Sequence, residues 1–141
     1  MKRIALLLIL FIHSLFGFTQ GTKAYIDSLI NILPTIKSDS HKVEVLNSIA
    51  WDISYEDFQK GIDYSYKALI LAKKINYEPQ ISRAYNCLGT IYADMGLHED
   101  AIKFHLLALE LNKKNNRPNG VASSYANISI VYANMENFEI A

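Results

Sequence analysis

The chain has 141 residues, of which 50% are apolar and 20% are charged, and its 14 basic residues balance its 14 acidic ones. This composition is typical of a folded globular protein and excludes a collagen-like or wholly disordered chain. The neutral balance argues against a broad nucleic-acid-binding surface, which needs clustered excess Lys and Arg. Its single cysteine excludes an internal disulfide framework.

The first 20 residues predict a secretory signal peptide. Lys2 and Arg3 precede an apolar run of 15 residues, which is shorter than a bilayer-spanning helix. Small residues, Gly17 and Thr19, stand where a signal peptidase would cut, so we expect cleavage after Thr19 and a periplasmic or secreted protein. The alternative is an uncleaved membrane anchor. Cleavage would leave 12 basic and 14 acidic residues, a net charge of −2.

Residues 21–42 are expected to form a linker and an N-terminal capping helix. The helix is predicted from Thr22 to Leu33, and Pro34 marks its end because proline disrupts a helix interior. This helix would cover the open end of the repeats that follow.

The rest of the chain carries an internal repeat with a period of 40 residues. At this offset the run 84–86 (Ala-Tyr-Asn) aligns with 124–126 (Ser-Tyr-Ala), and the first copy is one residue shorter. The pattern predicts a first repeat at 43–81, a second at 82–121, and a truncated third at 122–141. We expect the third repeat to stop just as its second helix begins.

Apolar residues within each repeat recur at steps of three and four, as at Ala84, Leu88 and Ile91, which predicts helices. Gly96 is a helix stop between the two helices of the central repeat. A lone helix pair cannot bury both of its apolar faces, so neighbouring repeats must stack. The sequence therefore predicts an all-α fold of stacked helix–turn–helix repeats, an α-solenoid.

The central copy reads Tyr85-x-x-Leu88-Gly89-x-x-Tyr92, with Ala101 and Ala108 in its second helix, and it resembles the tetratricopeptide repeat. The resemblance implies a right-handed superhelix that binds proteins or peptides. Small residues would let the paired helices approach closely, while larger ones fill the gaps. Register and resemblance assign the following side chains to packing between helices: Ile49, Ala50, Gly61, Ala68, Tyr85, Leu88, Gly89, Tyr92, Ala101, Ala108, Tyr125, Ile128 and Tyr132.

Repeats of this family most often have 34 residues, so six extra residues need a place. We expect them at 73–80 and 113–119, as additional helical turns and a longer connection. This longer variety resembles extracytoplasmic repeats that precede a membrane span and a histidine kinase or DNA-binding domain in some bacterial regulators.

In a curved stack the first helix of each pair lines the concave side. Side chains that point away from the partner helix are then candidates for a partner-binding groove: Glu44, Asn47, Trp51, Tyr55, Arg83, Asn86, Thr90, Asp94 and Asn134. Asn47 and Asn86 share one repeat position, where amides can hold a peptide backbone. Trp51 has two interpretations, a binding anchor in the groove or a core residue against the capping helix.

The sequence contains no recognisable catalytic motif. His98 and His105 share a helix face, but no further ligand completes a metal set. Cys87 has neither a second cysteine nor a local base, and no glycine-rich phosphate loop occurs. We therefore expect no cofactor, no metal and no nucleic acid.

The sequence thus predicts an exported, non-catalytic scaffold for a protein or peptide ligand. One alternative is the sensory N-terminus of a longer membrane-bound histidine kinase or transcription regulator, of which this chain is a fragment. A second alternative is an enzyme or an enzyme's accessory subunit. We also expect self-association through the truncated third repeat, and membrane contact only with an uncleaved signal or a downstream span.

Overall fold

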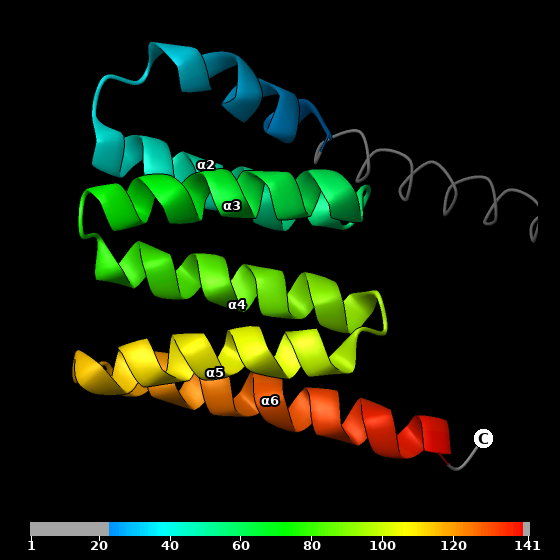
Figure 1. Cartoon of the computed structure of the whole chain (residues 1–141). Helices are drawn as coiled ribbons and strands as arrows, with labels where there is room; N and C mark the ends of the chain where they lie inside the picture. Colours follow the sequence, from blue (N-terminus) through cyan, green and yellow to red (C-terminus); the bar gives the residue numbers. More distant parts are fainter. Residues whose placement is uncertain (1–22, 140–141) are drawn as a thin grey trace, which may run out of the picture.

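The computed structural model describes residues 23–139, which fold into helices that run back and forth along a single stack (Figure 1). The predicted signal peptide lies outside the described residues. Residues 23–32 are helical and lead into a short 3-10 helix, η1 (Leu33–Thr35), which contains Pro34. Five α-helices follow: α2 (Asp39–Ser54), α3 (Phe58–Lys74), α4 (Glu78–Asp94), α5 (His98–Lys114) and α6 (Pro118–Glu139). The residues described include no strand.

Helix length accounts for the 40-residue period. Helices α3, α4 and α5 each have 17 residues. The connections 75–77, 95–97 and 115–117 between consecutive helices are all short. The expectation of a longer connection was therefore wrong, because helical turns alone accommodate the extra residues.

The turns at the ends of α3, α4 and α5 share one geometry. Each contains a residue with positive φ: Asn76 at 54°, Gly96 at 75° and Asn116 at 50°. After each of these residues a backbone N–H reaches back to a carbonyl of the finished helix, as Tyr77 N–H does to Ala72 O at 2.8 Å. Glycine and asparagine tolerate this left-handed conformation best, so they end the helices here.

The third repeat differs from the expectation that its second helix begins at the end of the chain. Helix α6 runs without a break to Glu139, although the repeat register places a turn at position 136. Gly96 makes that turn in the second repeat, whereas Glu136 occupies the corresponding position in the third. Glutamate favours a helix and has no left-handed preference, so the helix continues.

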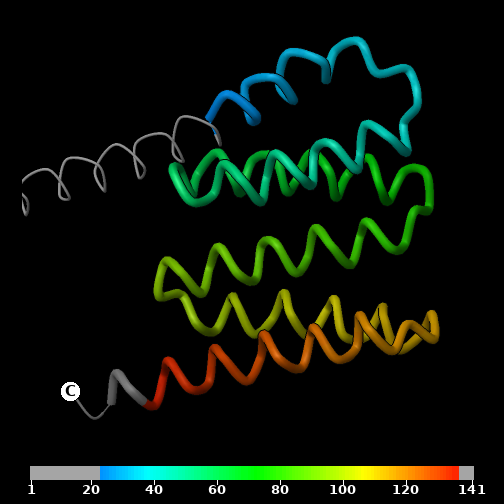
Figure 2. The backbone as a smooth tube through the Cα atoms, turned by 180° about the vertical axis from the view of Figure 1, so that it is seen from behind, coloured from blue at the N-terminus to red at the C-terminus, as the bar shows by residue number. Residues whose placement is uncertain are grey.

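Alternate helices lie closer together on one face of the stack than on the other. Each helix packs against the next along the chain, and α4 also contacts both α2 and α6. Within the described residues no close backbone approach joins α3 to α5. Helices α2, α4 and α6 therefore form an inner row. The view from behind shows the helices following one another along the stack in chain order (Figure 2).

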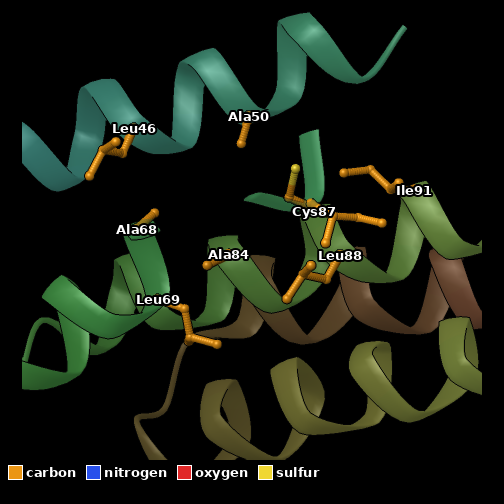
Figure 3. Close-up of a cluster of buried hydrophobic side chains, with 9 residues drawn as sticks. Leu46, Ala50, Ala68, Leu69, Ala84, Cys87, Leu88 and Ile91 are labelled. Atoms are coloured by element: carbon orange, nitrogen blue, oxygen red, sulfur yellow. The ribbon is translucent and has the colours of Figure 1, made fainter. Parts of the chain in front are cut away.

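The core is continuous from α2 through α3 to α4. Figure 3 shows Leu46 and Ala50 of α2 above side chains from α3 and α4, including the fully buried Leu88. A second cluster joins Ile26 of the N-terminal helix to Ile49 on α2. The N-terminal helix thus covers apolar surface that the first repeat leaves open.

Candidate functional site

The second repeat shows how the assigned packing residues meet. Gly89 lies so close to α5 that an added Cβ would stand 2.6 Å from Cε1 of His105. The rings of Tyr92 and Phe104 stack with centroids 5.4 Å apart. Tyr85, Tyr92 and Ile128 are partly buried. Eight assigned residues are buried: Ile49, Ala50, Gly61, Ala68, Leu88, Gly89, Ala101 and Ala108.

Two tyrosines assigned to packing are instead exposed. Tyr125 is 50% and Tyr132 is 51% exposed, because no other described helix covers their face of α6. Lys113 Nζ donates to Tyr125 Oη at 2.8 Å and lies over the tyrosine ring. Lys73 lies over Tyr85 in the same way one repeat earlier, so the local geometry is repeated without the covering helix.

A groove of about 540 Å³ crosses the inner row of helices. Four of the predicted binding residues line it: Asn47, Trp51, Arg83 and Asn86. Its other walls come from α4, α5, the turn before α6, and α6 itself, through Pro79, Gln80, Ser82, Cys87, Asn112, Arg117, Gly120 and Ser123. The groove therefore draws on all three repeats.

Asn47 is buried rather than exposed as expected, with only 1% of its surface accessible. Its Nδ2 donates to Gln80 O at 3.1 Å and to Gln80 Oε1 at 2.9 Å, which ties α2 to α4. Its Oδ1 is buried and has no hydrogen-bond partner. A buried amide oxygen is a good acceptor for a donor that a ligand brings.

Trp51 is 41% exposed and belongs to neither core cluster. Its ring meets that of Tyr55 edge to face, with centroids 5.9 Å apart at 85°. Tyr55 itself is 68% exposed and lies outside the groove lining. The structure thus places Trp51 at the groove and not against the capping helix.

Three other predicted residues lie around a separate, smaller cavity of about 90 Å³ between α4, α5 and α6. Thr90, Asp94 and Asn134 line it together with His105. His105 Nδ1 donates to Asn86 Oδ1 at 3.1 Å, since an amide oxygen can only accept. Burial lowers the pKa of His105 from 6.5 to about 4, so the ring is neutral at physiological pH.

Glu44, the ninth predicted residue, lies elsewhere. It lines a hollow between α2 and the N-terminal helix, and its Oε1 accepts a hydrogen bond from Tyr77 Oη at 2.8 Å. The nine predicted residues are therefore divided among the groove, the small cavity, this hollow and the surface at Tyr55.

Sequence reasoning missed the contribution of Asn112 and Arg117 to the groove. Arg117 Nη1 donates to Asn112 Oδ1 at 3.4 Å, and Asn112 is buried against Ser124 of α6. The first repeat has the buried alanine Ala72 at the position of Asn112. The sequence did contain a signal for Asn112, because a polar residue stands where the first repeat has an alanine.

Charge is divided along the inner row. Arg83 and Arg117 belong to the groove, near the beginnings of α4 and α6, whose helix dipoles are positive there. Asp52 and Asp94 lie towards the ends of α2 and α4. Burial raises the pKa of both carboxyl groups, and Arg83 partly offsets that increase at Asp52.

Metal-binding groups and membrane-spanning helices are both absent from the described residues. They contain no group of three or more His, Cys, Asp or Glu side chains arranged to hold a metal ion. Among residues 23–139 no helix combines the length and the apolar character that crossing a membrane requires.

These features define a class of protein in which stacked helix pairs present a groove on their inner row. A family model of the tetratricopeptide repeat matches residues 80–141. No curated protein is significantly similar to the chain. This match and the helical repeats together support a protein of the tetratricopeptide repeat type. Such repeats generally mediate interactions between proteins and are typically non-catalytic scaffolds.

Proposed function

We propose that this protein is an exported, non-catalytic scaffold that holds a segment of another protein in the groove across α2, α4 and α6. The observation that carries the proposal is the exposed Trp51 at a groove lined by polar side chains. Large amphipathic rings beside a pocket are common anchors of protein interfaces. The tetratricopeptide repeat match supports the same function.

The groove chemistry supports binding over catalysis. Cys87 is the groove's thiol, yet it is 3% exposed, and burial raises its pKa, which disfavours the reactive thiolate. The groove lining contains no histidine or carboxylate to act as a general base.

A binding measurement with a single substitution tests the scaffold function. Peptides selected from a random library against the full chain supply the ligand, and fluorescence anisotropy gives Kd. Trp51→Ala should weaken binding by about 2 kcal/mol, roughly 30-fold, because it removes a central anchor. The helical circular dichroism signal should persist, since Trp51 lies outside the core.

Phe58→Ala is the matched control. Phe58 is 40% exposed at the beginning of α3 and does not line the groove, so this variant should bind normally. Equal affinities for the wild type and Trp51→Ala, or failure of any peptide to bind, would contradict the proposal.

Export is a proposal that rests on the basic and apolar beginning of the sequence. N-terminal sequencing of the protein purified from an expressing bacterium tests it. Cleavage after Thr19 gives a chain that begins at Gln20, whereas an intact Met1 contradicts cleavage.

The uncovered face of α6 favours a second candidate function. In a longer membrane-bound histidine kinase or transcription regulator, a further helix would cover Tyr125 and Tyr132 as α5 covers α4. The gene sequence downstream of Ala141 decides this point. A reading frame that continues into an apolar span supports the sensory function, and a stop codon there contradicts it.

A further inference from the structure

The two arginines of the groove have no ionic partner among the described residues. Arg83 Nη2 donates to the hydroxyl oxygen of Ser48 at 3.5 Å, and Arg117 Nη1 donates to the amide oxygen of Asn112 at 3.4 Å. The ion pairs that the described part of the chain forms involve lysines instead. Both guanidinium groups therefore retain donors for an anion.

No carboxylate belongs to the groove lining, although the whole chain is electrically neutral. Arg83 interacts electrostatically with Asp52, which is partly buried and lies outside the groove lining. Glu78, in the first turn of α4, faces Lys114 at 3.9 Å. The groove thus has excess positive charge at the helix beginnings, where the dipoles add to it.

Asn47 adds an observation at the groove wall that does not depend on charge. This residue lines the groove and is only 1% exposed, and its Oδ1 has no hydrogen-bond partner. Its Nδ2 is already bound to Gln80, so the side chain is held in place. A fixed, unpaired acceptor suits the backbone N–H of an extended segment.

We propose, on the basis of the function proposed above, that the groove takes an extended segment through an internal Asp or Glu side chain. Its carboxylate lies between Arg83 and Arg117, and a backbone N–H of the same segment donates to Asn47 Oδ1. Arg83 is on the central helix of the inner row, with groove residues of α2 on one side and of α6 on the other. A segment that reaches Arg83 therefore continues in both directions, which favours an internal acid over a chain terminus.

Selection from a random peptide library tests this charge preference. One arm uses peptides with acetylated and amidated ends, and a second arm uses the same library with free C-terminal carboxylates. Both are selected against the full chain. Capped peptides should bind and be enriched in Asp or Glu at one position, and their affinity should fall with added salt.

Substitution of both partners then tests the contact itself. Arg83→Gln and Arg117→Gln should each weaken a selected acidic peptide about tenfold, since each removes a charge-assisted hydrogen bond. Replacing the peptide's Glu with Gln should have a similar effect in the wild type, and no further effect in the double variant Arg83→Gln, Arg117→Gln. Lys103→Gln, an exposed change on α5, is the control and should bind normally.

The outcomes separate this inference from the proposed function. If capped peptides bind through Trp51 but show no acidic preference, the inference is wrong and the scaffold function stands. If only peptides with a free terminus bind, the groove recognises a terminal carboxylate and the inference is also wrong. If no peptide binds in either arm, both are overturned.

Discussion

The second and third repeats carry nearly the same sequence pattern but have different surroundings. In α4, the run from Tyr85 to Tyr92 is covered by α5, with Phe104 stacked on Tyr92. In α6, Tyr125 and Tyr132 hold the same register, yet each is about half exposed. The sequence pattern therefore determines which face of a helix is apolar, and the presence of a neighbouring helix determines whether that face is buried.

The largest difference in stability between the two repeats is expected when a core residue is shortened to alanine. Leu88 is completely buried, so Leu88→Ala should lower the free energy of unfolding by about 3 kcal/mol through lost burial and a cavity. Ile128→Ala, the matched change in α6, should cost about 1 kcal/mol because Ile128 is only partly buried. Urea titration followed by circular dichroism measures both, and equal costs would contradict the comparison.

Acid should destabilise the covered repeat through His105. Its pKa is about 4 in the folded protein and 6.5 in the unfolded chain, so the unfolded state binds the proton more readily between these values. Stability is therefore present above pH 6.5 and lost as the pH falls towards 4, by about 3 kcal/mol at the lower end. Urea titrations at pH 7 and pH 4.5 measure this loss.

A His105→Gln variant is the control for the pH dependence. Glutamine keeps a donor for Asn86 but does not titrate, so its stability should change less over the same pH range. An unchanged pH slope would show that another group is responsible.

An exchange of small residues tests the close approach of α4 and α5. Gly89→Ser adds a Cβ within 2.8 Å of three His105 ring atoms and should cost about 1–2 kcal/mol of stability. Ser129→Gly makes the reverse change on the uncovered face and should cost about 0.5 kcal/mol from helix propensity alone. Thermal melts of both variants decide whether the two costs differ in this order.

The smallest effect on stability is expected at the two exposed tyrosines. The double variant Tyr125→Ser, Tyr132→Ser should change the unfolding free energy by less than about 0.5 kcal/mol in total. We expect the wild type to self-associate through this face, because exposed apolar patches favour association. Sedimentation equilibrium should show a concentration-dependent mass for the wild type and a monomer for the variant. A monomeric wild type would contradict this expectation.

The repeat register predicted contact faces well but could not supply their partners. Ala101 and Ala108 are buried where the pattern placed them, because a small residue at a helix crossing depends on local spacing alone. Asn47 was expected in the groove, and it is there, but it is tied to Gln80 in the first turn of α4, far along the chain. The exposure of Tyr125 likewise depends on what packs against α6, which its own helix does not encode.

Residues in the turns were harder to interpret. Arg117 was not among the predicted groove residues, yet the turn before α6 places it in the groove wall. The break expected at position 136 failed for a related reason, since the repeat alignment gave the place of the turn but not its chemistry. A turn of this type needs a residue that tolerates positive φ, as Gly96 does.

The missing contact between α3 and α5 has a mechanical consequence. Consecutive repeats are joined along the inner row and through the link from α3 to α4, while the outer helices of neighbouring repeats stay apart. A small rotation between repeats therefore changes the outer spacing without breaking the apolar core at the inner row. We expect the stack to bend by such rotations between repeats, which would let the groove adjust its width to a bound segment.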